Sequence, residues 1–168
     1  MILTSKKMDA GLKTRAQVLQ EIAEAEKVRT SRGSLLFEKG AAFEVDSSNP
    51  GRFLTAMSQR NKLFDGTLDM LGWQSSRWGK EHWYELNFRK HPPKFSKIGL
   101  YGYNMGDPAV KIWKFGEWKN LAPKKTENAP NHILLDFGEE LKSVKIRIDF
   151  PGKKHNQPVE LYEIELLK

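Results

Sequence analysis

Residues Leu63–Phe88 read LFDGTLDMLGWQSSRWGKEHWYELNF and carry the strongest strand and turn signals of the chain. They include three of the five tryptophans and an Asp-Gly pair at residues 65–66, a dipeptide that favours a tight turn. Near the end of the segment, Tyr84, Leu86 and Phe88 alternate with polar residues, as on one face of a β-strand. The segment therefore predicts a turn followed by a strand with one apolar face.

Short strands are predicted at regular intervals around this segment. Residues 35–48, LLFEKGAAFEVDSS, predict a strand pair or one strand with a bulge at Gly40. Further on, clusters of Gly, Pro and Asn separate the strands, and no helical pattern intervenes. This arrangement predicts a β-sandwich or barrel. The later strands are KIGLYGY (97–103), VKIWKF (110–115), WKNL (118–121), HILLDF (132–137), SVKIRIDF (143–150) and VELYEIELL (159–167).

In the first 34 residues, the apolar residues repeat at a helical spacing and not at the two-residue spacing of a strand. Apolar residues at spacings of three and four form one stripe, which predicts an amphipathic α-helix over residues 8–26. We therefore divide the chain into a helical arm with a basic linker, residues 1–34, and a β-domain, residues 35–168. The apolar stripe must pack against another surface. The alternatives are the sandwich of the same chain, a second copy of the chain and a partner protein. Its members are Met8, Leu12, Ala16, Leu19, Ile22 and Ala23.

The composition limits the classes of protein that the chain can form. Its 168 residues are 39% apolar, enough for one domain with a hydrophobic core. Cysteine is absent, which excludes disulfides and thiolate metal sites. This absence favours a reducing compartment or a protein that needs no disulfides for stability. No apolar run of the ~7–15 residues of a secretory signal or the ~20 residues of a membrane span is found. The net charge of +7 favours polyanionic partners: glycans, nucleic acid, an anionic membrane surface or an acidic subunit. The alternative is a solvated basic surface without such a partner, because acidic residues are interspersed along the chain.

Motifs of the common catalytic sites are absent from the sequence. It contains no HExxH, Walker loop, GxSxG or dinucleotide-binding fingerprint. The four histidines lack the spacing of metal ligands: His82, His91, His132 and His155. We therefore expect a protein that is not an enzyme.

In the order of its motifs, the β-domain resembles the galactose-binding-like fold of discoidin and coagulation-factor type C domains. AAFEVDSSNP is similar to the first strand and loop of that family, LFDG to its Asp-Gly turn, and WQSSRW to the tryptophan-serine run that follows. HWYELNF, KIGLYGYN, the GEW turn, KSVKIRIDF and VELYEIELL continue this order. The spacing from Asp65 to Trp73 is longer than in the family, and its terminal cysteines are missing. The resemblance implies an all-β, antiparallel jelly-roll β-sandwich after the helical arm.

The resemblance also implies a structural calcium ion under the Asp-Gly turn. Backbone carbonyls, an aspartate and a glutamate near the last strand hold such an ion, and these oxygen ligands suit Ca²⁺. The matching residues are Asp65 and Glu163, together with Asp69. The alternative is that Asp65 only caps the turn.

Sugar-binding members of the family hold their ligand in loops at one end of the sandwich. An aromatic ring stacks on the apolar face of the sugar, while Arg, Asn and His side chains bind its hydroxyl groups. Ordinary loop packing is the alternative for each residue of this kind. The candidates are Arg77, Trp78, Tyr103, Asn104, His155 and Asn156.

Three basic runs lie in predicted loops. If they meet at one rim of the domain, they form a site for phosphate or sulfate groups. A solvated surface is the alternative, and no RNA-recognition, zinc-finger or helix-turn-helix motif supports nucleic-acid binding. The runs are Arg89–His91 with Lys94 and Lys97, then Lys124–Lys125, and Lys153–His155.

These observations predict a non-catalytic binding or adhesion module for a carbohydrate, and by charge for an acidic glycan. The alternative is a structural subunit or adaptor of a large assembly, such as a phage tail, baseplate, capsid or other virion component, held by its N-terminal helix. A DNA-repair-type scaffold is a third interpretation, because such sandwiches also occur there. The sequence leaves the location of the protein open.

Overall fold

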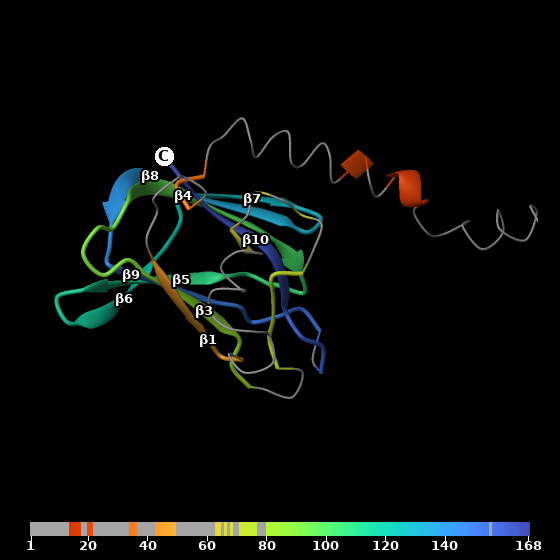
Figure 1. The fold of residues 1–168 in the computed structure, drawn as a ribbon, viewed down its shortest axis with the longest axis horizontal. Coiled ribbons are helices and arrows are strands. Elements are labelled where there is room, and N and C mark those ends of the chain that lie inside the picture. The colour runs from red at the N-terminus through yellow and green to blue at the C-terminus, as the bar shows by residue number, and fades with distance from the viewer. Residues whose placement is uncertain are drawn as a thin grey trace, which may run out of the picture.

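The computed structural model describes residues 14–17, 20–21, 34–36, 43–49, 63–64, 66, 68, 71–76, 80–154 and 156–168. These residues form two five-stranded sheets packed as a β-sandwich (Figure 1). Sheet A has the strand order β1-β3-β9-β5-β6, and sheet B has the order β2-β10-β4-β8-β7. All neighbouring strands are antiparallel, which confirms the predicted architecture. The strands are β1 Glu44–Ser47, β2 Trp73–Gln74, β3 Trp83–Asn87, β4 Lys94–Tyr103, β5 Ala109–Lys114, β6 Glu117–Leu121, β7 Lys125–Ala129, β8 His132–Lys142, β9 Lys145–Asp149 and β10 Glu160–Leu167.

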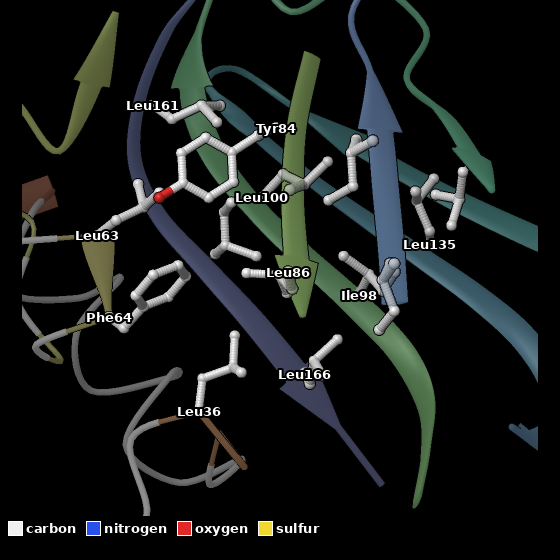
Figure 2. Packing of buried hydrophobic residues seen from close by; sticks show 14 of the residues in the cluster. Leu36, Leu63, Phe64, Tyr84, Leu86, Ile98, Leu100, Leu135, Leu161 and Leu166 are labelled. Atoms are coloured by element: carbon white, nitrogen blue, oxygen red, sulfur yellow. The ribbon is translucent and has the colours of Figure 1, made fainter. Parts of the chain in front are cut away.

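The apolar residues that alternate along the strands fill the space between the sheets. In sheet A, Tyr84 and Leu86 of β3 pair with Ile148 and Ile146 of β9, and all four side chains are buried. Sheet B faces them with residues that include Leu100 of β4 (Figure 2). Complete burial of one such side chain contributes about 1.5–3 kcal/mol.

A β-bulge in β10 moves two acidic residues away from this core. The pairing of β10 with β4 shifts register between Leu161 and Glu163. Leu161, Ile164 and Leu166 belong to the core, so Glu163 and Glu165 lie on the opposite face of sheet B. Both carboxylates are nevertheless buried.

The strand registers assign the connections to two opposite ends of the sandwich. Tyr103, the last residue of β4, pairs with Glu160, the first residue of β10. The β4–β5, β7–β8 and β9–β10 connections therefore meet at one end, called the loop end (residues 104–108, 130–131, 150–154 and 156–159). At the other end, Lys94 pairs with Lys142 and Asn87 pairs with Lys145. This turn end carries the β3–β4, β5–β6 and β8–β9 turns (residues 88–93, 115–116 and 143–144).

The positions of the basic runs correct one prediction. Arg89–His91 lies at the turn end, whereas Lys153 and Lys154 lie at the loop end. The expected convergence of the three runs on one rim is therefore wrong, because the β3–β4 and β9–β10 connections leave opposite ends of antiparallel strands. Lys125 belongs to β7 and not to a loop.

The sequence pattern does not predict two strands and one turn of this structure. All five residues of β7 are exposed, so this edge strand has no apolar alternation to reveal it. Strand β2 is only two residues long. Leu35 and Leu36 form a turn, in which the Leu35 backbone nitrogen donates to the Leu166 carbonyl oxygen (2.8 Å). The bulge expected at Gly40 lies outside the described residues.

The described part of the N-terminal arm is helical at residues 15–17 and 20–21. Thr14 precedes this helix: its backbone nitrogen donates to Gln17 Oε1 (2.9 Å), and the Gln17 backbone nitrogen donates to Thr14 Oγ1 (3.2 Å). This reciprocal capping box starts a helix after Thr14, which corrects the prediction of one continuous helix over residues 8–26. Most of the apolar stripe lies outside the described residues. In the described part of the chain, we find no helix with the length and apolar character of a membrane span.

Tyr84 provides a test of the core. Its side chain is fully buried, and its hydroxyl group points toward Leu63 (Figure 2) without a hydrogen-bond partner among the described residues. Burial, followed by the nearby Asp46 carboxylate, raises the pKa of Tyr84, so its hydroxyl group stays neutral. A buried polar group without a partner costs about 1–3 kcal/mol. We expect Tyr84→Phe to increase the free energy of unfolding by about 1 kcal/mol in chemical denaturation.

The matched control is Tyr162→Phe, because the Tyr162 side chain is only half-buried. Its free energy of unfolding should stay close to that of the wild type. A clear loss of stability in Tyr84→Phe would mean that the hydroxyl group has a stabilising partner.

Candidate functional site

A cleft of about 550 Å³ lies at the loop end. Its size is in the range of pockets that bind small ligands. The β4–β5, β7–β8 and β9–β10 connections line it together. The polar and charged side chains of its lining are Tyr103, Asn104, Asp107, Asn128, Asn131, Lys153 and Lys154.

Asn104 ties two of these connections together. Its backbone has a positive φ of 60°, which asparagine tolerates better than most residues. Its side-chain Oδ1 accepts hydrogen bonds from the backbone nitrogens of Lys153 and Lys154, both at 2.8 Å. Its Nδ2 lies within donating distance of three carbonyl oxygens, those of Lys154 (3.3 Å), Gln157 (3.2 Å) and Pro158 (3.3 Å). The geometry favours a role of Asn104 in shaping the cleft over the ligand contact expected from the sequence.

Two glycines allow the same connections to approach closely. Gly106 and Gly152 have positive φ angles of 68° and 74°. A Cβ atom on Gly106 would lie 2.9 Å from the Gly152 carbonyl oxygen, closer than side-chain carbons tolerate. The Gly152 backbone nitrogen donates to the Met105 carbonyl oxygen (3.3 Å). The close approach of the β4–β5 and β9–β10 connections beside the cleft therefore requires glycine at position 106.

Replacing Asn104 by aspartate tests the role of its side chain. The aspartate would keep the acceptor for the Lys153 and Lys154 nitrogens, but it would bring a carboxylate against three carbonyl oxygens. We therefore expect Asn104→Asp to lower the free energy of unfolding by about 2 kcal/mol, measured by chemical denaturation.

The control is Asn131→Asp. Asn131 has nearly the same backbone φ, 61°, but its side chain is exposed. This variant should be as stable as the wild type. Equal stabilities of Asn104→Asp and Asn131→Asp would show that the Asn104 amide group does not hold the loop.

The remaining cleft residues offer an aromatic ring, amide groups and positive charge. The Tyr103 side chain is 42% exposed, and its hydroxyl group donates to Gln157 Oε1 (3.4 Å). Lys153 and Lys154 are exposed at the cleft, and Asp107 is the single carboxylate in its described lining. Such a surface can stack on an apolar ring face and form hydrogen bonds with hydroxyl or anionic groups.

The structure describes three of the six predicted ligand-binding residues. Tyr103 and Asn104 line the cleft together, and Asn156 is exposed in the adjacent β9–β10 connection. Arg77, Trp78 and His155 lie outside the described residues.

Other cleft residues were not predicted from the sequence. Asn128 and Asn131 flank the turn between β7 and β8, where the cluster APNH indicates a turn and no more. Their position beside Tyr103 follows from the pairing of β8 with β4, where His132 lies opposite Tyr101. In addition, the Gly102 backbone nitrogen donates to the Asn131 carbonyl oxygen (3.0 Å). These contacts depend on strand pairing, which local sequence patterns do not reveal.

The Glu163 side chain lies at the Asp-Gly turn, where the expected calcium site requires a carboxylate. The Gly66 backbone nitrogen donates to Glu163 Oε1 (3.3 Å), and Glu163 is 1% exposed. Asp65 and Asp69 lie outside the described residues. Within the described ranges, no group of three or more His, Asp or Glu side chains is arranged to hold a metal ion. The position of Glu163 fits the expected ligand set, and the calcium site stays a prediction.

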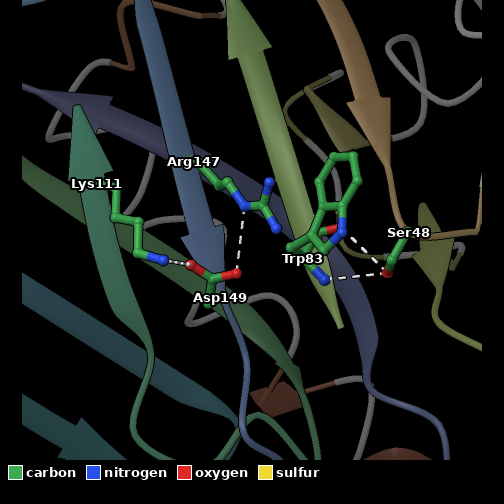
Figure 3. A network of polar contacts seen from close by, with 5 residues as sticks. All are labelled: Ser48, Trp83, Lys111, Arg147 and Asp149. Atoms are coloured by element: carbon green, nitrogen blue, oxygen red, sulfur yellow. Dashed lines mark hydrogen bonds and ion pairs between the residues drawn. The ribbon is translucent and has the colours of Figure 1, made fainter. Parts of the chain in front are cut away.

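Trp83 is held in place on the outer face of sheet A (Figure 3). The guanidinium carbon of Arg147 lies 4.2 Å from the centroid of the Trp83 ring, a cation–π contact. Arg147 Nε and Lys111 Nζ each lie 3.3 Å from a carboxylate oxygen of Asp149. The Trp83 backbone nitrogen donates to Ser48 Oγ (3.0 Å). These contacts indicate a structural role for Trp83.

The two antiparallel sheets form a β-sandwich with the galactose-binding-like fold of solved carbohydrate-binding modules. No family model matches the sequence, and no curated protein sequence matches it. The similarity of this chain to known proteins is therefore found by comparing structures and not by comparing sequences.

Solved carbohydrate-binding modules have a similar fold. CpGH89CBM32-6 from Clostridium perfringens superposes with a TM-score of 0.59 and 18% identity over 79% of this chain and 98% of that module. CpGH89CBM32-5 of the same organism, in complex with GalNAc-β-1,3-galactose, has a TM-score of 0.55 and 9% identity over 75% and 95% of the two chains. The family 32 module of NanJ from C. perfringens, in complex with galactose, has a TM-score of 0.55 and 12% identity over 76% and 93%. Identities this low show that the fold is shared.

Proposed function

We propose that this chain is a non-catalytic carbohydrate-binding module with its ligand in the loop-end cleft. The observation that carries the proposal is the convergence of an exposed aromatic ring, amide side chains and two lysines in one cleft of suitable volume. The similar folds add support, since two of the modules compared above were solved with bound galactose or GalNAc-β-1,3-galactose.

Each part of the cleft has a proposed role in binding. The exposed ring of Tyr103 stacks on the C–H face of a sugar ring. The amide groups of Asn128 and Asn131 both donate and accept hydrogen bonds, as sugar hydroxyl groups do. Asn104 acts indirectly, because its side chain holds the connection that carries Lys153 and Lys154. Binding in this arrangement involves no bond making.

The charge of the cleft favours a sugar with a carboxylate or sulfate group. Lys153 and Lys154 are both exposed there, against the single carboxylate of Asp107 in the described lining. An exposed ion pair contributes at most about 1 kcal/mol, so charge selects among glycans while stacking and hydrogen bonds supply most of the affinity. The net charge of +7 also favours an acidic ligand.

A glycan array with neutral, uronic and sulfated glycans tests the proposal. We expect acidic glycans to bind, and Tyr103→Ala to lower their affinity about tenfold or more through loss of the stacked ring. Replacing both Lys153 and Lys154 by alanine should weaken acidic glycans more than neutral ones and reduce the dependence of affinity on salt.

The control replaces Lys124 and Lys125 by alanine, which removes the same charge outside the cleft lining. This variant should bind like the wild type. The proposal fails if no glycan binds, or if Tyr103→Ala binds with unchanged affinity.

We further propose that Glu163, with Asp65 and Asp69, holds a structural calcium ion. The support is the buried Glu163 carboxylate at the Asp-Gly turn and the preference of Ca²⁺ for such oxygen ligands. Bound calcium would stabilise the folded state, by about 2.7 kcal/mol at a concentration 100 times its dissociation constant. We expect calcium to raise the thermal unfolding midpoint and Glu163→Gln to abolish that increase.

Glu139→Gln is the control, since Glu139 is exposed on β8, and this variant should keep the response to calcium. Identical midpoints of the wild type in calcium and in chelator would refute the site.

The alternative of a structural subunit in a large assembly stays a prediction from the N-terminal arm. Residues 15–17 and 20–21 are helical and exposed. The cleft favours the carbohydrate-binding proposal, because a purely structural role would not require its combination of aromatic, amide and cationic groups.

A further inference from the structure

Strand β6 forms an open edge of sheet A. It stands last in the strand order of that sheet, and β5 is the strand that pairs with it among the described residues. Figure 1 shows the β5–β6 hairpin at the outer border of the sandwich. Glu117, Lys119 and Asn120 are exposed along this edge. The backbone N–H and C=O groups on the open side of an edge strand can bind a further strand.

The register of the β5–β6 hairpin decides which backbone groups of β6 point to the open edge. Lys114 pairs with Glu117 across a two-residue turn, and the backbone groups of such a closing pair face each other. In an antiparallel ladder, pairs of this kind alternate with pairs whose backbone groups point away from each other. Trp118 and Asn120 therefore direct their N–H and C=O groups to the open edge.

The charged side chains of β6 are complementary to those of a second, antiparallel copy of the strand. A two-fold axis at Trp118 places Glu117 of each copy opposite Lys119 of the other. These two side chains lie on one face of the strand, where they already form an ion pair within the chain. Opposite charges that face each other across two strands contribute about 0.2–1 kcal/mol per pair. An axis at Asn120, the other residue with outward backbone groups, would bring no opposite charges together.

Trp118 supplies an apolar centre for the same arrangement. Its half-buried side chain packs edge to face against Trp113 of β5, with ring centroids 5.2 Å apart. Ser143 Oγ accepts a hydrogen bond from the Trp113 backbone nitrogen (3.2 Å), which ties this pair to the β8–β9 turn. An axis at Trp118 places the Trp118 rings of the two copies side by side on one face. Aromatic pairs across strands are stabilising, and tryptophan is enriched at protein interfaces.

The other edge strands of the described sheets lack this combination. In β1, pairing with a second copy about Val45 would place Glu44 opposite Asp46, so that like charges meet. Strand β2 is only two residues long. All five residues of β7 are exposed, but none of them has a large apolar side chain. Complementary charge and an aromatic centre therefore occur together on β6.

We propose that two copies of this chain associate through β6, antiparallel about a two-fold axis at Trp118. The two A sheets then continue into each other as one sheet, held by the outward backbone groups, two Glu117–Lys119 pairs and the tryptophan rings. This proposal does not depend on the proposed glycan function, because no residue of β6 lines the loop-end cleft.

Sedimentation velocity of the full chain over a range of protein concentrations tests this inference. We expect the wild type to show a monomer–dimer equilibrium. Glu117→Lys should raise the dissociation constant of the dimer about tenfold or more, because two attractive pairs become repulsive. The double variant Glu117→Lys with Lys119→Glu restores opposite charges across the axis and should dimerise nearly as well as the wild type. Trp118→Thr keeps a strand-forming residue but removes the ring, and it should weaken the dimer about tenfold.

The matched control is Glu127→Lys on β7, because the Lys125–Glu127 ion pair has the same spacing at the edge of the other sheet. This variant should dimerise like the wild type. The inference is overturned if the wild type sediments as a monomer at every concentration, or if Glu117→Lys dimerises equally well. It is also overturned if Glu117→Lys loses the dimer and the double variant does not regain it, since that result excludes the register about Trp118.

Discussion

Packing between the inner faces of the two sheets is the constraint on which the rest of this structure depends. Tyr84 and Leu86 of β3 face Leu100 of β4 across the core, and these side chains are completely buried. Because successive residues of a strand point to opposite faces, a slip of one residue would turn such side chains into solvent. The burial of apolar area therefore selects one register for each strand pair. The same registers decide which strand ends lie together, so the core and the position of the cleft are specified at once.

Within the cleft, the residues that shape the site differ from those available to a ligand. Asn104 is nearly buried, and its amide group is engaged with the backbone of the β9–β10 connection. Gly106 and Gly152 permit the close approach of the same two connections. Tyr103, in contrast, remains partly exposed on the neighbouring strand end. Such positioning residues keep the side chains that contact a ligand in fixed places.

The sequence-based predictions are accurate where apolar and polar residues alternate clearly and fail where this alternation is missing. In β9, Ile146 and Ile148 alternate with polar residues, and the strand forms where this pattern predicts it. In β7, all residues are exposed, so only its backbone pairing with β8 identifies it as a strand. In the arm, the apolar period suggests a longer helix, but the Thr14–Gln17 capping box places a helix start inside it. For the site, the sequence indicates Tyr103 and Asn104, but it does not indicate Asn128 or Asn131.

By itself, the sequence determined the fold class, the main strands and the chemical types of the candidate ligand residues, because alternation, turn residues and motif order are local properties. The tertiary structure decided which of those residues meet. Lys153 joins Tyr103 at the loop end, whereas Arg89, in an equally basic run, lies at the turn end. It also revealed that the Asn104 amide group holds the β9–β10 connection and that Phe115, at the β5–β6 turn, is exposed. The physical reason is that antiparallel pairing brings together residues far apart in the chain, and no local pattern records the register that the core selects.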